Sequence, residues 1–356
     1  MSSQVFFIPA TGKEPFKSLA KKTEKVFVRL GLEKEIEENS FTALKIHFGE
    51  KGNKGFIKPL WLSSLIKRLK QKKAQVFLTD TNTLYIGHRS NSVKHHHLAY
   101  GHGFTQAALG IPVIIADGII GRYEENIQVD LPRVKIAKVA GTFVHTDILL
   151  CLSHFTGHIL TGFGAAIKNL GMGCASRAGK LEQHSVVHPR VNQEVCKFCG
   201  TCFDYCPADS IVEKNGKAFI QEDKCIGCGE CLVVCTAGAV KLTWDNDKIR
   251  VQEKMAEYAA AVQKLFYKKA GYINFLIKIT KDCDCMCKDA PLIVEDIGIL
   301  GSLDPVAVDR ASVDLVNKTA GKEILKIYND IDWSVQLTYG EKIGLGTNDY
   351  ELIEIF

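Results

Sequence analysis

Eight cysteines in the second half of the chain share one repeated spacing. They lie in CKFCGTCFDYCP, at residues 196–207, and in CIGCGECLVVC, at residues 225–235. Each stretch has the spacing C-x2-C-x2-C-x3-C, whose two-residue gaps let a tight loop turn three thiolates toward one cubane. The repeat therefore predicts two [4Fe-4S] clusters.

Both runs are predicted to contribute ligands to each cluster, because in this spacing the fourth cysteine ligates the cluster of the other run. The predicted ligand sets are Cys196, Cys199, Cys202 and Cys235 for one cluster, and Cys225, Cys228, Cys231 and Cys206 for the other. Gly200, Gly227 and Gly229 permit close approach of the backbone and amide hydrogen bonds to sulfur. The alternative is a pair of zinc sites, but these use C-x2-C pairs that stand apart. Thr236 replaces the proline that follows the first run, and this change does not affect ligation.

The cysteine-rich stretch is acidic, whereas the rest of the chain is basic. Residues 191–240 contain seven acidic and four basic side chains, a net charge of −3 in a chain of +5, which leaves +8 elsewhere. This contrast favours docking of the stretch to the rest of the chain or to a basic partner. It does not favour a nucleic-acid partner.

A second group of cysteines lies in KDCDCMCK, at residues 281–288. On an extended strand Cys283, Cys285 and Cys287 would point to one side, about 6.6 Å apart in succession. The outer two would then lie about 13 Å apart, too far for one ion with metal–sulfur bonds of about 2.3 Å. Metal binding by all three therefore requires a turn, which Asp282 and Asp284 favour.

Three interpretations of this second group remain open. The first is a metal site or a third iron–sulfur site at Cys283 and Cys285, completed by Cys174 or a histidine. The second is a pair of redox thiols or thiols that contact substrate, and the third is a structural role. The two aspartates argue against an inert packed strand, because they make poor core residues.

Other polar residues follow strands that are expected to be parallel, and ligands bind beyond the carboxyl ends of such strands. His154, His158, Lys168, Asn169 and Cys174 lie in SHFTGHILTGFGAAIKNLGMGC, after the strand DILLCLS. GFGAAIKN either cradles an anion at a helix start, with Lys168 adding charge, or forms a plain turn. A metal, a substrate hydrogen bond and a structural role all remain open for His154 and His158, which share a face only if the segment is helical.

Two further strand ends carry polar groups that suit either a ligand site or a polar loop. The residues are Asp80, Thr81 and Asn82 in one loop, and Lys45, His47, Glu50 and Lys54 in the other. The consecutive histidines 95–97 fan across about 200° of a helix, so they do not all face one metal. Cys151 lies in an apolar strand and is expected in the core.

The elements that must position these residues alternate between strand and helix. Strands are predicted at 4–9, 42–48, 74–80, 111–117, 134–140, 147–153, 272–280 and 292–300, and helices at 14–38, 59–73, 92–102, 253–266 and 304–318. Asp304 is the expected N-cap of the last helix, with Pro305 in its first turn. The pattern predicts an α/β fold: a mostly parallel sheet with helices on both faces, interrupted by a small ferredoxin-like α+β insert. The predicted parts are 1–190, the two-cluster insert 191–240, and 241–356.

Composition narrows the class of protein. The chain has 356 residues, of which 46% are hydrophobic, and no run of 18 apolar residues that would predict a membrane span. The first residues lack the features of a secretory signal, so a cytoplasmic location is expected. Thirteen cysteines in that reducing compartment point to metal binding rather than disulfides. The basic stretch 67–73 has no interleaved aromatic residues and is expected to be a solvated helix face.

Several longer motifs resemble an uncharacterised iron–sulfur-centre family, a domain-of-unknown-function family (number 362), here with an embedded bacterial-type two-cluster ferredoxin module. The resemblance extends from about residue 42 to 317 and is carried by ALKIHFGEKGN, FLTDTNTLY, RSNSVKH, LSHFTGH, GFGAAIKNLGMGCASRAGKLEQHS, CDC and DIGILGSLDPVAVDRASVDLVN. It implies an α/β domain with two clusters and no agreed reaction. The family pattern contains the C-D-C pair of Cys283 and Cys285 but not a third cysteine at position 287.

These features favour an oxygen-sensitive, ferredoxin-dependent oxidoreductase. In this hypothesis the insert accepts low-potential electrons from a protein such as a ferredoxin and passes them to a substrate or metal in the α/β domain. The site would be lined by Cys283, Cys285, Cys174, His154, His158 and Lys168. The alternatives are a non-catalytic electron-transfer subunit, an iron–sulfur or metal delivery factor, and a binding protein with structural clusters. A small-molecule substrate is expected, and binding to nucleic acid or to a membrane is not.

Overall fold

One eight-stranded sheet forms the centre of the molecule. The computed structural model describes residues 2–85, 87–184, 189–225, 229–241 and 248–356. The strand order is β16-β1-β15-β14-β7-β2-β3-β4. The strands are β1 (Ser3–Pro9), β2 (Phe41–Ile46), β3 (Gln75–Asp80), β4 (Val113–Ile115), β7 (Ile148–His154), β14 (Ala270–Leu276), β15 (Gly298–Ser302) and β16 (Tyr350–Glu354).

The sheet is mostly parallel, as the alternation of strands and helices predicts. The neighbours from β4 through β3, β2 and β7 to β14 all pair in parallel. β15 is antiparallel to both β14 and β1, and β16 is parallel to β1. The carboxyl ends of β2, β3, β7 and β14 therefore lie at one edge of the sheet, where the predicted polar residues follow them.

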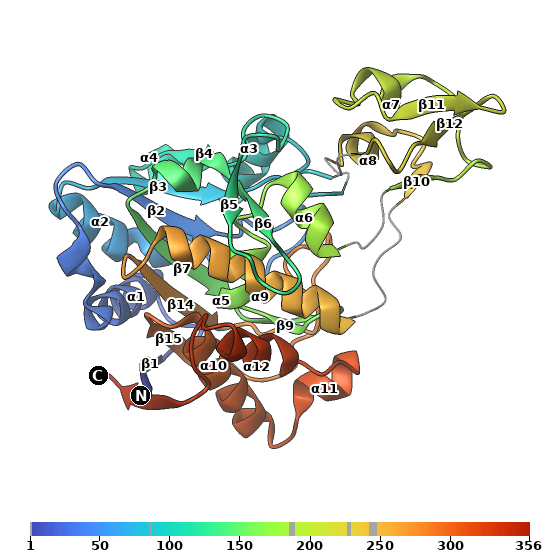
Figure 1. Cartoon of the computed structure of the whole chain (residues 1–356). Helices are drawn as coiled ribbons and strands as arrows, with labels where there is room; N and C mark the ends of the chain where they lie inside the picture. Colours follow the sequence, from blue (N-terminus) through green and yellow to red (C-terminus); the bar gives the residue numbers. More distant parts are fainter. Residues whose placement is uncertain (1, 86, 185–188, 226–228, 242–247) are drawn as a thin grey trace.

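Helices cover both faces of this sheet (Figure 1). Side chains alternate along β7, where Leu150 packs into the core cluster that includes the first helices and Leu149 packs into the cluster that includes the later ones. Such a strand is buried on both faces, which explains its unbroken apolar run. The principal helices are α1 (Phe16–Leu30), α2 (Ser63–Gln71), α3 (Ser92–Gly101), α5 (Ala166–Gly171), α6 (Arg177–His184), α9 (Lys248–Leu265), α10 (Pro305–Ala320) and α12 (Val335–Lys342).

The remaining elements are shorter. They are α4 (Gln106–Leu109), α11 (Ile324–Asn329), the 3-10 turns η1 (Leu32–Glu35), η2 (Pro59–Leu62) and η3 (Gly141–His145), and the paired strands β5 (Glu124–Gln128) with β6 (Ile136–Ala140) and β8 (Thr156–His158) with β9 (Gly162–Gly164). The predicted α/β fold class is confirmed. Asp304 caps α10 as predicted, accepting hydrogen bonds from the amides of Val306 and Ala307.

Three predicted elements differ from the observed ones. Residues 134–140 do not join the main sheet, because β6 instead forms a hairpin with β5. The strand predicted at 292–300 begins only at Gly298, because the Asp296 carboxylate accepts the amides of Gly12 and Lys278 and turns the chain. The helix predicted at 14–38 ends at Leu30, where Gly31 takes up a left-handed conformation with φ of 71°.

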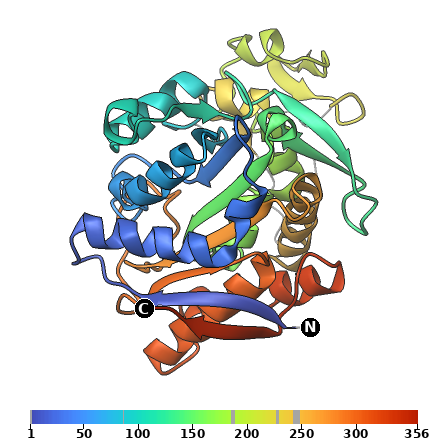
Figure 2. The same ribbon diagram turned by 90° about the vertical axis from the view of Figure 1, so that its left-hand side faces the viewer.

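The cysteine-rich stretch lies at one end of the molecule, away from β1 and β16 (Figures 1 and 2). Its described elements are β10 (Arg190–Val191), α7 (Thr201–Asp204), β11 (Ile211–Lys214), β12 (Lys217–Ile220), α8 (Glu230–Val234) and β13 (Val240–Lys241). β10 pairs with β13, which brings the two ends of the stretch together. No helix within the described ranges is both long and apolar enough to cross a bilayer.

Candidate functional site

The cysteine-rich stretch contains two small cavities that divide the described cysteines as the ligand prediction does. One cavity is lined by Cys196, Cys199, Cys202 and Cys235. The other is lined by Cys206, Cys225 and Cys231. Cys228, the remaining predicted ligand of this second set, lies outside the described residues, as does Gly227. In both cavities the fourth cysteine of one run thus lies with cysteines of the other run.

The thiols in these cavities receive backbone hydrogen bonds that suit iron–sulfur ligands. The amides of Phe198, Ser210 and Ala239 donate to the Sγ atoms of Cys196, Cys206 and Cys235, at 3.4, 3.3 and 3.1 Å. Such N–H groups stabilise thiolate ligands and tune cluster potentials. The residues present therefore fit [4Fe-4S] clusters, while the cluster number stays a prediction.

The second of these cavities borders the α/β part of the chain. Gly229 lines this cavity, and a Cβ atom on it would lie 3.0 Å from Cδ1 of Leu84. Next to it, Glu230 is buried and pairs with Arg177, with Oε1 and Nη1 2.6 Å apart. Arg122 lies 3.4 Å from the same carboxylate and also donates to the backbone oxygen of Tyr205.

Leu84 also lines a much larger cavity, of about 520 Å³, at the carboxyl ends of the parallel strands. Polar residues that follow each of β2, β3, β7 and β14 contribute to its wall, as expected for an open α/β sheet. Of the predicted residues, Lys54 and Asn82 do not line it, and the Asn82 side chain instead donates to Asp117. Its titratable lining residues are Lys45, His47, Glu50, Asp80, Tyr85, His88, Arg89, His154, His158, Lys168, Lys180, His184, Cys283, Asp284, Cys285 and Cys287.

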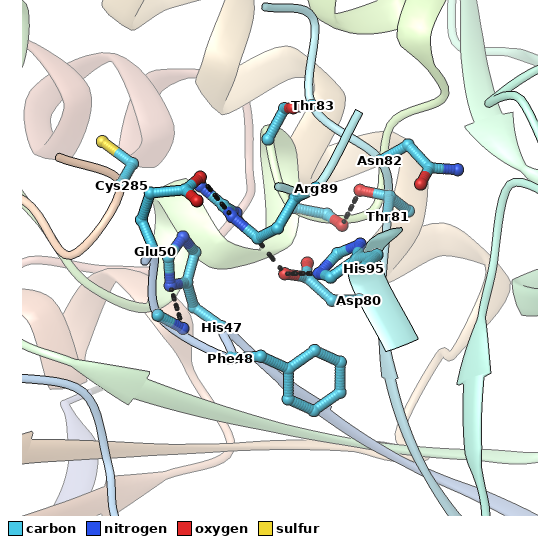
Figure 3. A network of polar contacts seen from close by, with 12 residues as sticks. His47, Phe48, Glu50, Asp80, Thr81, Asn82, Thr83, Arg89, His95 and Cys285 are labelled. Carbon is cyan, nitrogen blue, oxygen red and sulfur yellow. Dashed lines mark hydrogen bonds and ion pairs between the residues drawn. The ribbon is translucent and has the colours of Figure 1, made fainter. Parts of the chain in front are cut away.

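A buried charge network forms one wall of this cavity (Figure 3). Lys45 pairs with Asp80 at 2.8 Å, and Arg89 lies between Glu50, at 3.1 Å, and Asp80, at 3.9 Å. Burial opposes ionisation of Asp80, but Lys45 and His95 beside it hold the pKa of its carboxyl group below the usual range. Asp80 is therefore an anion that neutralises the lysine rather than a proton donor.

Cys283, Cys285 and His158 meet on another wall. Their ligand atoms all lie within 4.8 Å of one another. A turn brings the two thiols together: the amide of Met286 donates to the Cys283 carbonyl oxygen, and the amide of Cys285 donates to Cys283 Sγ at 3.4 Å. The turn required by the sequence argument is thus present, but Cys287 is exposed and lies outside this trio.

Gly157 allows β8 to bring His158 close to this turn. Its amide donates to the Thr280 carbonyl oxygen at 2.8 Å, and a Cβ atom on it would lie 2.1 Å from the Lys281 carbonyl oxygen. A side chain at this position would push the two segments apart. The glycine in SHFTGH therefore has a positional role that its sequence did not reveal.

Lys168 supplies positive charge beside the thiols. Its Nζ donates to Cys283 Sγ at 3.3 Å. A hydrogen bond from Cys285 and the charge of Lys168 lower the pKa of the Cys283 thiol to about 5, despite its burial. The pKa of the Cys285 thiol is raised by its hydrogen bond to Cys283 and by burial.

Of the predicted site residues, Cys174 lies elsewhere. It is buried on the α5 side, where its Sγ approaches the Asn169 carbonyl oxygen at 3.8 Å, and it does not line the cavity. It therefore does not complete the Cys283 site. His154 lines the cavity, but Asp284 and the Ile277 carbonyl oxygen occupy its two ring nitrogens, at 2.7 and 2.8 Å. His154 therefore positions Asp284 and is not available as a ligand.

The predicted anion cradle at GFGAAIKN is occupied by the protein itself. The amides of Ala166 and Ile167 donate to the two carboxylate oxygens of Asp309 on α10, at 2.8 and 2.9 Å. His154 and His158 lie on strands, not on one helix face. The consecutive histidines face different surroundings, as the helical fan predicts: His95 is fully buried beside Asp80, His96 is half-buried and His97 is exposed.

Four further residues line the cavity without having been predicted from the sequence: Arg89, Tyr85, Lys180 and His184. Arg89 is buried and donates to the Tyr85 hydroxyl, and Lys180 Nζ donates to the Ala175 carbonyl oxygen at 2.7 Å. Arg89 lies within the family motif RSNSVKH, which was the available signal. The same signal was available for Tyr85, in FLTDTNTLY, and for Lys180 and His184, in GFGAAIKNLGMGCASRAGKLEQHS. Within α6 itself, nothing in the local pattern distinguishes Lys180 and His184 from solvated residues.

Comparisons with known proteins find relatives of the cysteine-rich stretch and distant likenesses to solved structures. An uncharacterized ferredoxin of Methanocaldococcus jannaschii is 42% identical over 48 residues, which is 13% of this chain and 29% of the relative. Pyruvate synthase subunit PorD of Thermotoga maritima is 37% identical over 69 residues, 19% of this chain and 69% of the relative. The lactate racemase apoprotein of Thermoanaerobacterium thermosaccharolyticum aligns with a TM-score of 0.39 and 13% identity, over 76% of this chain and 50% of that one.

The chain thus spans less than two thirds of the first of these relatives and of the solved structure. Its cysteine-rich stretch is similar to [4Fe-4S] ferredoxins. A family description matches much more of the chain, from residue 42 to residue 314. The protein belongs to the family described as "Domain of unknown function (DUF362)", and within it carries a ferredoxin-like iron–sulfur segment.

Proposed function

We propose that this protein is an iron–sulfur redox protein that relays low-potential electrons into the large cavity. Residues 191–240 form a ferredoxin-like unit with two [4Fe-4S] clusters, inserted between the two parts, 1–190 and 241–356, of one α/β domain. The cavity holds the electron acceptor, which is a small-molecule substrate, a metal at Cys283 and Cys285, or both.

The contact between Gly229 and Leu84 is the observation that carries this proposal. Gly229 lines the cavity of the second cysteine set, and Leu84 lines the large cavity. The ideal Cβ position on Gly229 lies 3.0 Å from Leu84 Cδ1, so the two cavities share a wall one side chain thick. The Cys206, Cys225, Cys228 and Cys231 set is therefore the proximal cluster, and the Cys196, Cys199, Cys202 and Cys235 set is the distal one.

The exposure of the cysteines supports an entry point at the distal cluster. Cys199 is exposed, and Phe198 beside it is 40% exposed. The clusters, when bound, supply one electron at a time. Electrons from a ferredoxin-like donor would enter near Cys199 and leave toward Leu84.

The cavity can bind and orient a small polar molecule. Lys168, on α5, and Arg89, after β3, are held in place by hydrogen bonds to Cys283 Sγ and Glu50. Apolar side chains, among them Leu84, Ile159 and Met172, form the rest of the wall and exclude water from part of the space. Lys168 can provide hydrogen bonds to charge that develops on a substrate during reduction. A cytoplasmic location and a reducing environment suit such chemistry.

The test is a screen for cavity-dependent oxidation. The clusters of anaerobic protein are photoreduced, and small oxidised compounds are tested for their ability to reoxidise them. A substrate should reoxidise the wild type much faster than Lys168→Ala, while a viologen, which reacts at the exposed cluster, should oxidise both equally. If every active compound reoxidises the wild type and Lys168→Ala at the same rate, the cavity does not hold the electron acceptor.

A non-catalytic electron-transfer subunit is the second candidate, favoured by the similarity to a relative named as a subunit of pyruvate synthase. A metal delivery factor is the third, favoured by the exposure of Cys287 beside the Cys283 turn. The screen separates the first candidate from both, because only the first requires a compound that depends on the cavity.

A further inference from the structure

We infer that His158, Cys283 and Cys285 bind one thiophilic divalent transition-metal ion, with an open coordination position that faces the large cavity. This inference deepens the proposed function and rests on it only for the use of the metal, not for its binding. Among the described residues, these three are the one group of His, Cys, Asp or Glu side chains whose ligand atoms converge in this way.

The spacing of the ligand atoms fits one ion rather than a third cubane. Two thiolates that share one ion at bonds of about 2.3 Å lie at most about 4.6 Å apart. In a cubane each thiolate binds a different iron, so its ligand sulfurs lie farther apart than those of a single ion. All three ligand atoms lie within 4.8 Å of one another, close to the single-ion limit.

The surroundings of His158 prepare its ring to be a ligand. Its Nδ1 lies 2.9 Å from the Thr161 hydroxyl oxygen, and that hydroxyl lies 2.6 Å from the Phe163 carbonyl oxygen. When Thr161 donates to the carbonyl, its oxygen accepts Nδ1–H of His158, and the lone pair remains on Nε2. A second partner that fixes the ligating tautomer is typical of metal-bound histidines. The Leu160 amide lies 3.3 Å from Nδ1 and would donate to it, which favours the other tautomer. This contact is longer and therefore weaker than the one to Thr161.

Lys168 and the cavity complete the arrangement. Lys168 donates to Cys283 Sγ, so its charge offsets part of the negative charge of two thiolates. Three protein ligands beside an open cavity are the arrangement of catalytic metal sites, whereas structural sites close with four. Two sulfurs and one imidazole select Zn²⁺, Fe²⁺ or a neighbouring ion over Mg²⁺ or Ca²⁺. The fourth position is where a small molecule with an oxygen, nitrogen or sulfur donor would bind.

The experiment counts metals and sulfide in whole protein purified without oxygen and, as a second step, titrates chelator-treated protein with Zn²⁺ alone. Two cubanes bring about eight irons and eight sulfides per chain. The wild type should bind about one further ion with no further sulfide. His158→Gln, Cys283→Ser and Cys285→Ser should each lose that ion and keep the cubanes, whereas Cys174→Ala and Cys287→Ser should keep both.

X-ray absorption at the edge of a redox-inert occupant such as Zn²⁺ checks the wild type directly, so the result does not depend on how the variants fold. Two sulfur and at least one nitrogen neighbours are expected. A gain of about four irons with four sulfides would mean a third cluster and would overturn the inference, as would the absence of any further ion after the Zn²⁺ titration. Neither outcome would contradict the proposed electron relay, which the reoxidation screen tests separately.

Discussion

Arg177 of α6 and Glu230 of α8 form an ion pair with both side chains nearly fully buried, at 1% and 3% exposure. Arg177 also donates to the Ser90 carbonyl oxygen, so its guanidinium ties the cysteine-rich stretch to the loop that carries the cavity wall. Glu230 directly follows Gly229, which contacts Leu84. The ion pair therefore fixes the distance between the proximal cysteine set and the cavity.

Arg177→Ala should loosen this attachment. Loss of one partner from a buried pair costs about 3–5 kcal/mol when the other charge is left uncompensated. Because Arg122 lies 3.4 Å from the same carboxylate and compensates part of its charge, the expected cost is smaller. Limited proteolysis of the cysteine-rich stretch should speed up, and reoxidation of the clusters through the cavity should slow, with an unchanged iron content. Arg190→Ala is the matched control, because the Arg190–Glu222 pair is exposed, at 64% and 50%, and should matter by about 1 kcal/mol or less. Equal effects of the two substitutions would refute the attachment role.

The exchange of the fourth cysteines predicts which double variants keep a cluster. Cys199→Ala with Cys235→Ala removes two ligands from one predicted set, so about four of eight irons should remain. Cys199→Ala with Cys206→Ala removes one ligand from each set, and both clusters should be weakened. Iron and sulfide analysis with electron paramagnetic resonance separates the patterns. The reverse result would mean that each run ligates its own cluster.

Gly157→Ala should disturb the Cys283 site without changing a ligand. A methyl group 2.1 Å from the Lys281 carbonyl oxygen must push β8 away from the turn, at a cost of about 1–3 kcal/mol, and His158 moves with it. We expect weaker Zn²⁺ binding in a chelator competition and a lower Tm. Gly101→Ala is the control, because no heavy atom lies within 4 Å of its Cβ position on α3. If Gly157→Ala keeps wild-type Zn²⁺ affinity, β8 does not position the histidine.

Asp309 should make stability depend on pH. Burial raises the pKa of this carboxyl group to about 7, against about 3.9 in an unfolded chain. Between these values the folded protein keeps a proton that the unfolded chain has lost, so this contribution to stability falls as pH rises from about 4 to 7. The Tm of the wild type minus the Tm of Asp309→Asn should therefore decrease between pH 5.5 and 7, measured at one scan rate. A difference that grows with pH would contradict this assignment.

Local patterns in the sequence predicted the features that depend on local physics. A few neighbouring residues are enough to predict each of three features: the apolar strand β7, the Asp304 cap and the C-x2-C-x2-C-x3-C ligand loops. The polar residues after β2, β3 and β7 were placed at one sheet edge because the strands were expected to be parallel. Most of these side chains line one cavity, but those of Lys54, Asn82 and Cys174 do not.

What the sequence did not predict depends on contacts between distant segments. An anion cradle and a plain turn were both open for GFGAAIKN, but Asp309, from a helix far along the chain, binds the amides of Ala166 and Ile167. Cys174 was grouped with Cys283 only by residue type, and the path of the chain after β9 places it beneath α5 instead. His158 meets Cys283 because Gly157 permits a close backbone approach, and no periodicity encodes that contact.

The most direct test of the relay is an electron-transfer measurement between the cavity and the clusters. Cys287 is exposed and lines the cavity mouth, so a ruthenium photosensitiser can be attached there, with Cys287→Ser as the labelling control. After a laser flash oxidises the label, we predict electron transfer from reduced clusters at a rate independent of protein concentration. It should persist in Cys199→Ala with Cys235→Ala, which lacks the distal cluster, and vanish in Cys225→Ala with Cys231→Ala, which lacks the proximal one. Transfer that depends on concentration, or that survives without the proximal cluster, would contradict the proposed route.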